Sequence, residues 1–411
     1  MALYDGSNAP TITVEFDTSS VGVFTLGVSL LGGTDVLGDG TPVWTAIPTT
    51  DLRTLTIRRG RTREDQAVNP GTTTLILENR SSNYDPDNIK SPYYWNGFTI
   101  LNSGLGVRIS ATWSGTTYMI YRGYLEQIDV DESLDPIATL QFTDALAWIA
   151  RRSIPTISSS YSGDSTSTRL GRILDLIGWS SSLRSIAGSR TMQPTTLGDN
   201  ALSLSDQVAQ CEFGRFYADR QGNLTLLPYE SLFTTPSRIN FSDDRSSGTV
   251  EYDTIVTNPG AKYLQNSITI NQTTGLSQSY DDATSQARFG IYQKSYDAPL
   301  LDNPTAGALA AIIASRYSLP KTRVDRVEFD AIGLDSSVWS SLLQTDFGDN
   351  CTVQRTTVDA RTRIFTSLVE SIQYDITPIN WRVGMDLSPA AGVAYFTIGS
   401  SLLNGTDILY V

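Results

Sequence analysis

Hydrophobic and polar residues alternate along one long stretch of the chain, residues 52–126. The alternation is regular in three runs, at 55–57, 71–80 and 107–122, and Ser114-Gly115 divides the third run. A period of two is typical of half-buried strands, and a Ser-Gly break between two such runs indicates a hairpin. We therefore predict that the second and third runs belong to one β-barrel.

Helical spacing appears in the next part of the chain. Apolar residues between 170 and 177 recur at i, i+3, i+4 and i+7, and Gly178 follows them as a helix-ending residue. A second helix is predicted to begin near Ser203, and residues 215–227 read as a hairpin that turns at Arg220-Gln-Gly-Asn. This part is predicted to be a small α+β region.

Strand patterns return after about residue 240. They are interrupted by an Ala-rich helix that is predicted to be capped by Thr305 and to end before Pro320. The predicted fold class is mainly β (β+α), with two β-barrel-like domains flanking the smaller α+β region. The predicted division is an N-terminal β domain (1–155), the middle region (156–240) and a second β domain (241–411). In the first domain Trp113 is predicted to be largely buried.

Charge and composition limit the partners that the chain can bind. The net charge of −13 argues against a surface that grips nucleic acid, which needs clustered Lys and Arg. An acidic wall would still suit a conduit that DNA passes through, although solubility alone accounts for the charge. The 411 residues contain no histidine, which removes the commonest general base and transition-metal ligand.

The two cysteines and the apolar runs indicate where the chain folds. Cys211 and Cys351 lie far apart and have no CxxC partner, so two free thiols in a reducing cytosol are favoured over a disulfide. The N-terminus has no signal-peptide pattern, and the longest apolar run, 306–314, is too short to cross a bilayer. We expect a chain without a membrane-spanning segment that is made in the cytosol.

A series of short motifs follows in a fixed order over residues 58–124. They are Arg58-Arg59-Gly60-Arg61, Glu78-Asn79-Arg80, Tyr84-Asp85-Pro86-Asp87-Asn88, Pro92-Tyr93-Tyr94, Val107-Arg108-Ile109 and Arg122-Gly123-Tyr124. The ordered set resembles the N-terminal region of minor tail proteins of long-tailed bacteriophages, the tail-hub family related to baseplate hubs. A second region, Gly214 to Leu224, is similar to that family's helix-and-hairpin pattern. The resemblance covers most of the chain except Ser231 to Asn303.

The resemblance implies a structural role at the distal end of a phage tail. Hubs of this family are typically trimers whose chains each supply two tube-type barrels, so that a threefold ring presents six similar units to a hexameric tube. The implied partners are further copies of the chain, tail-tube proteins, other tail-tip or receptor-binding proteins and, transiently, DNA in the lumen. The implied location is the virion, after synthesis in the host cytoplasm.

Catalytic and metal motifs are missing from the sequence. It has no GxSxG, HExxH or Gly-rich phosphate loop, so we expect no enzyme activity and no cofactor. Asp129, Asp131, Glu132 and Asp135 lack the glycine of a calcium loop, which favours a solvated loop. The alternative function is a carbohydrate-binding or cell-wall-degrading virion component. Its candidate sugar-stacking residues are Tyr93, Tyr94 and Trp95, for which core packing is the default.

A local basic run stands out in this acidic chain. It consists of Arg58, Arg59, Arg61 and Arg63. One interpretation is a solvated strand end. The other is an inter-subunit ion-pair strip, which arginine suits because its guanidinium group binds carboxylates in a bidentate way. The sequence favours neither.

One segment occurs twice, near the two ends of the chain. Residues 24–37 read FTLGVSLLGGTDVL and residues 396–409 read FTIGSSLLNGTDIL, with ten of fourteen positions identical. A shared turn chemistry explains the Gly-Thr-Asp but not the repeated apolar residues. We predict two docking hairpins that fit equivalent grooves on neighbouring units. Their candidate contact residues are Phe24, Leu26, Leu30, Leu31, Phe396, Ile398, Leu402 and Leu403.

Overall fold

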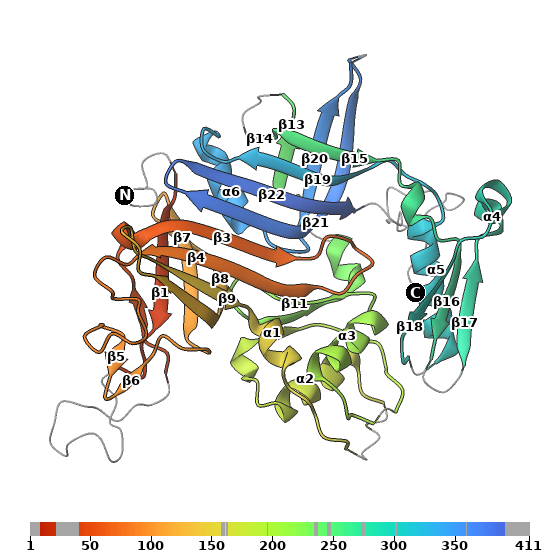
Figure 1. Cartoon of the computed structure of the whole chain (residues 1–411). Coiled ribbons are helices and arrows are strands. Elements are labelled where there is room, and N and C mark those ends of the chain that lie inside the picture. Colours follow the sequence, from red (N-terminus) through yellow and green to blue (C-terminus); the bar gives the residue numbers. More distant parts are fainter. Residues whose placement is uncertain are drawn as a thin grey trace.

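A sheet of 14 strands crosses the computed structural model (Figure 1). The structure describes residues 9–21, 41–157, 161, 163–194, 196–233, 237–244, 248–272, 276–300, 302–358 and 360–390. The main path of the sheet runs through β14 (Val250–Glu251), β13 (Ile239–Ser242), β20 (Asn350–Thr356), β21 (Thr362–Thr377), β3 (Leu52–Gly60), β4 (Asn69–Glu78), β9 (Ile137–Thr143), β8 (Thr116–Asp131), β7 (Gly106–Trp113), β1 (Thr11–Asp17) and β2 (Trp44–Ala46). Beside β21 lie β22 (Asn380–Pro389), β19 (Arg323–Asp330) and β15 (Thr254–Asn258). The mainly β prediction is confirmed.

Strands from opposite ends of the chain pair at the centre of this sheet. β3 lies antiparallel to β21, in a register that joins Leu55 to Ile376 and Gly60 to Ser371. Gly60 has a φ of +105°, and a Cβ there would lie 2.3 Å from the carbonyl oxygen of Glu370. Only glycine tolerates this close approach without strain. The sheet therefore continues from the predicted first domain into the predicted third.

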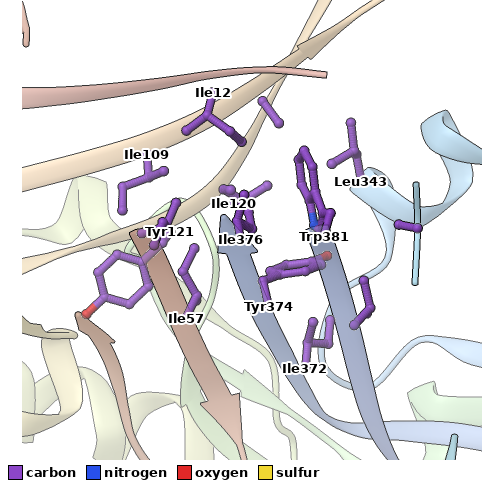
Figure 2. Packing of buried hydrophobic residues seen from close by; sticks show 14 of the residues in the cluster. Ile12, Ile57, Ile109, Ile120, Tyr121, Leu343, Ile372, Tyr374, Ile376 and Trp381 are labelled. Atoms are coloured by element: carbon purple, nitrogen blue, oxygen red, sulfur yellow. The ribbon is translucent and has the colours of Figure 1, made fainter. Parts of the chain in front are cut away.

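The hydrophobic core also extends through both halves of the sheet. Figure 2 shows side chains of the N-terminal half, such as Ile57 and Ile120, packed in one cluster with Ile376 and Trp381 of the C-terminal half. β4, β7 and β8 lie in one sheet, as the alternating pattern predicts. The prediction for Trp113 is wrong, because this side chain is only half-buried at the sheet end.

A second hydrophobic core lies among short elements of the middle region. It contains side chains of α1 (Ala145–Ala150), at the end of the predicted first domain, of α2 (Thr166–Leu176) and α3 (Ala201–Cys211), and of the sheet formed by β10 (Arg184–Ile186), β11 (Arg215–Ala218) and β12 (Leu224–Leu227). Side chains from residues 263–317 belong to the same core. Gly178 follows α2 with a φ of +74°, the conformation expected of a helix-ending glycine. Both predicted helices and the predicted hairpin are confirmed.

A small sheet projects at the right of Figure 1, in the stretch that the family resemblance does not cover. It contains β16 (Ser267–Asn271), β17 (Ser277–Asp281) and β18 (Gln293–Asp297), with α4 (Ala283–Phe289) between the last two and α5 (Asn303–Tyr317) packed against β16 and β17. The helix cap is Asp302, whose carboxylate accepts from the Thr305 amide at 2.7 Å, so the predicted Thr305 cap is wrong. The remaining elements are β5 (Tyr94–Trp95), β6 (Phe98–Thr99), α6 (Trp339–Gln344) and five short 3-10 helices at Thr49–Asp51, Ser181–Leu183, Tyr229–Phe233, Ala261–Tyr263 and Ser336–Val338.

Candidate interface residues and the buried ion network

The predicted docking residues and the basic run have different outcomes. Both copies of the repeat, 24–37 and 396–409, lie outside the described residues, so their docking role stays a prediction. All four arginines of the basic run are described. The structure separates them into two surface residues and two interior ones.

Strand geometry explains this separation. Arg59 lies two residues after Ile57, so it points to the same inner face of β3, while Arg58 points outward. Arg59 and Arg61 are each 9% exposed, whereas Arg58 is exposed and Arg63 pairs with Asp65 on the surface. The solvated interpretation is therefore wrong for Arg59 and Arg61, whose ion pairs form within the chain. An inter-subunit role stays a prediction for Arg58 and Arg63.

Arg61 belongs to a buried cluster around Glu370 of β21. The Nε of Arg61 lies 2.8 Å from Glu370 Oε2. The other carboxylate oxygen, Glu370 Oε1, accepts hydrogen bonds from Arg215 and, at 2.5 Å, from the Ser388 hydroxyl. The Glu370 side chain is only 1% exposed. Burial alone would raise the pKa of this carboxyl group, but the Arg215 and Arg61 guanidinium groups outweigh burial and lower it. The cluster joins the residue that follows β3 to β11, β21 and β22.

A second buried cluster surrounds Glu64, three residues after Arg61. Its carboxylate pairs with Arg316 at the end of α5 and, at 2.5 Å, with Nη1 of Arg323 in β19. Arg316 also donates to the Pro389 carbonyl at 2.8 Å, and the Arg323 guanidinium lies 3.8 Å from the Tyr263 ring centroid. Burial would raise the pKa of Glu64, yet Arg316 and Arg323 lower it. This cluster connects the projecting sheet's helix to the main sheet.

Arg59 provides a third connection, to the loop before β20. Its Nη1 lies 2.9 Å from Asp346 Oδ1, and its Nη2 donates to the Ala218 carbonyl at 3.1 Å. Residues 59–64 therefore contribute a charge to each of three buried contacts with distant parts of the chain. These charges neutralise one another within the chain, and removal of one partner would leave the other charge buried and uncompensated.

Apart from Arg59 and Arg61, the residues of the network were not singled out by the sequence. Glu370 sits at a β-bulge in β21, between Val369 and Ser371. Arg316 is the lone cation in α5, whose other buried residues are Ala, Leu, Ile and Tyr, and this was the available signal that it needed a buried acidic partner. Pairing across hundreds of residues leaves no local signature for Glu370.

The sugar-stacking candidates do not form a common exposed face. Tyr93 is 6% exposed, and its ring packs on Tyr84 at 5.7 Å and edge-on to Phe16 at 5.6 Å. Tyr94 and Trp95 are half-buried in β5. Core packing therefore accounts for Tyr93, and nothing in this geometry favours sugar stacking.

The structure also bears on metal binding, the two cysteines and membrane spans. Within the described ranges, no three His, Cys, Asp or Glu side chains are placed to hold a metal ion. Cys211 and Cys351 are both buried and unbridged, and burial raises the pKa of each thiol. No helix in the described part of the chain is long and apolar enough to span a membrane.

Two solved structures share this fold. The tail protein from Neisseria meningitidis MC58 has a TM-score of 0.58 at 9% sequence identity, over 92% of this chain and 96% of that chain. The 43 kDa tail protein of prophage MuSo2 from Shewanella oneidensis has a TM-score of 0.55 at 10% identity, over 92% and 98%. No family model and no curated protein matches the sequence. The likeness therefore shows a fold shared with these tail proteins.

Proposed function

We propose that the chain is a structural subunit of a bacteriophage tail, and that three copies form a hub ring at the distal end of the tail tube. The observation that supports this role is the fold shared with two tail proteins over 92% of the chain. The ring would close the lumen and anchor further tail-tip or receptor-binding proteins. DNA would contact it only during passage.

The buried ion network suits such a structural role. Three arginine–carboxylate contacts connect residues 59–64 to strands and helices from distant parts of the chain, with Arg61 and Glu370 309 residues apart. Bidentate and multiply bonded arginines fix orientation as well as distance. A subunit held in this way would transmit force between its halves as one body.

The repeated segments are proposed to supply the contacts between neighbours. Residues 24–37 and 396–409 share the apolar residues that a groove could bind, and the second copy follows β22, which ends at Pro389. Short strands do not persist alone in water, so each copy would need a sheet edge or groove on a partner.

Deletion of residues 391–411 tests this proposal. The structure sets that boundary, because Ser388 and Pro389 bond to Glu370 and Arg316 and must be kept. We expect the truncated chain to keep its unfolding midpoint but to lose trimers in native mass spectrometry and to be absent from purified tails. In the matched control, a Gly/Ser segment of equal length replaces residues 391–411, so that the chain keeps its length but loses the repeated segment. Normal trimers and normal incorporation would refute the docking role of the second copy, whereas a full-length chain absent from tails would refute the tail function itself.

A further inference from the structure

A pocket of about 100 Å³ lies between α3 and the segment that follows β3. On α3 it is lined by Asp206, Ala209 and Gln210, which lie on one side of the helix because they are three and four residues apart. Gln210 is exposed, as are Gln66 and Ala67 in the other segment, so the pocket opens to solvent there. A single water needs only about 10–15 Å³ of such space, so the pocket has room for a group of several heavy atoms.

One of the charges that line the pocket has no counter-ion. The side chains with ion pairs inside the chain are Arg61, Glu64, Asp65 and Arg215. Around Asp206, in contrast, no cation of the described residues lies within ion-pair distance and no donor bonds to the carboxylate. Burial raises the pKa of this carboxyl group to about 6, so it is still mostly ionised at neutral pH. A half-buried carboxylate without a partner costs stability, and a bound cation would remove that cost.

The remainder of the sequence contains little that could neutralise Asp206. Outside the described ranges there is one Lys or Arg, Arg245, which falls in sequence between β13 and β14. These two strands lie in the upper half of Figure 1, whereas α3 lies in the lower half. We therefore look for the cation on another molecule.

The walls of the pocket indicate which cation fits. Phe213, Phe216 and Tyr296 contribute aromatic rings, and Val68 and Ala209 contribute aliphatic groups. No three His, Cys, Asp or Glu side chains in the described ranges are placed to hold a metal ion, and one carboxylate is a poor site for a divalent cation. Apolar walls beside a single carboxylate suit the alkyl stem and the charged end of a lysine or arginine side chain.

We infer that this pocket binds a lysine or arginine side chain of an adjoining tail protein, with Asp206 as its counter-ion. Net charge selects the source of that side chain. A second copy of this chain carries the same charge of −13, whereas a neighbour with a basic surface is attracted by it. A long cationic side chain in a pocket with apolar walls is typical of an interface hot spot. The inference rests on the proposed place in a tail, because it needs a neighbouring tail protein.

Two substitutions remove the site at little risk to the core. Asp206→Asn keeps the shape of the side chain and removes its charge. Gln210→Arg places a cation at i+4 from Asp206, where it can pair with the carboxylate from within the chain and block the pocket. Both variants should raise the thermal unfolding midpoint, because each removes an unpaired half-buried charge. Glu132→Gln, at an exposed carboxylate between β8 and β9, is the matched control and should leave the midpoint unchanged.

Binding is measured on the full-length chain by saturation-transfer NMR. The probes are n-butylammonium and n-propylguanidinium, which are the lysine and arginine side chains beyond Cα. Asp206→Asn and Gln210→Arg should each weaken probe binding about tenfold or more, and Glu132→Gln should not change it. The control ligand 1-butanol has an alkyl stem without the charge and should bind about tenfold more weakly than the probes. Failure of both probes to bind the wild type, or equal binding by Asp206→Asn, would overturn the inference.

Photo-crosslinking in assembled tails identifies the neighbour. With p-benzoylphenylalanine in place of Gln210, we expect a crosslink to a different tail protein, at a peptide that contains Lys or Arg. Asp206→Asn in the same chain should reduce its yield. A crosslink to a second copy, or no crosslink, would overturn the inference and leave the proposed function standing, because the chain would still be present in tails. If the full-length wild-type chain is absent from tails, the proposed function and this neighbour are both refuted, whatever the probes show.

Discussion

Replacing Glu370 by glutamine tests whether the buried cluster joins the two halves of the sheet. The substitution keeps the size of the side chain and removes its charge. Arg61 and Arg215, 9% and 3% exposed, would then face each other's positive charge without a counter-ion. The new amide NH₂ would also point a donor at a guanidinium group, which has only donors.

The expected decrease in the free energy of unfolding of Glu370→Gln follows from this burial. Removing one partner of a buried ion pair costs roughly 3–5 kcal/mol, because the remaining charge stays desolvated. Glu328→Gln is the matched control, since Glu328 also bonds two arginines, Arg326 at 2.7 Å and Arg382 at 3.0 Å, but is 26% exposed. Exposed pairs of that kind contribute about 0–1 kcal/mol.

Urea unfolding followed by tryptophan fluorescence measures both variants. With a slope of about 3 kcal/mol per molar urea, Glu370→Gln should lower the unfolding midpoint by about 1 M or more. The midpoint of Glu328→Gln should change by less than about 0.3 M. Equal midpoints for the two variants would refute the reasoning, because the buried cluster would then be no more important than a surface pair.

Three further predictions concern packing and pH. Trp339→Ala should lower the free energy of unfolding by about 3–5 kcal/mol, because the Trp339 side chain is 1% exposed. Trp113→Ala should lower it by about half as much, because Trp113 is half-buried, and thermal unfolding measures both variants. Because the pKa values of Glu64 and Glu370 are lowered, the stability that their ionised forms contribute should be complete above about pH 4.5 and be lost as pH falls further. In Glu64→Gln, the urea midpoint should therefore decrease less steeply as pH is lowered below that value. Burial raises the pKa of Asp144 to about 7, so stability should decrease as pH rises from about 4 to 7, and Asp144→Asn should remove that decrease.

The sequence predicted local structure well and long-range pairing poorly. Alternation identified the strands around Ile57, Leu75 and Ile109 because a half-buried strand imposes its period on neighbouring residues. The same period places Arg59 on the inner face, but its charge favoured a surface interpretation, and only the distant Asp346 makes the buried position tenable. Periodicity contains no information about which strand pairs with β3.

Trp113 and the projecting sheet show two other limits. Trp113 continues the alternating pattern of β7, but it lies at the end of the strand. There its ring packs on Trp339 from outside the core, with the two ring centroids 6.0 Å apart. In β17 and β18 most side chains are exposed, so no alternation of apolar and polar residues marks these strands. Pattern analysis depends on a buried face, and these strands bury little.

The pairing of β3 with β21 also has a consequence for how the chain is made. The contacts that complete it, such as Arg61 with Glu370, join residues 309 positions apart. Because the ribosome adds about 5–20 residues per second, roughly 15–60 s pass between the synthesis of the first residue and that of its partner. Throughout that time one edge of β3 has unpaired backbone groups, which invite association with other nascent chains. Fragments that end before β21 should therefore aggregate, and slow release or chaperone binding during translation should decide the yield of folded subunits.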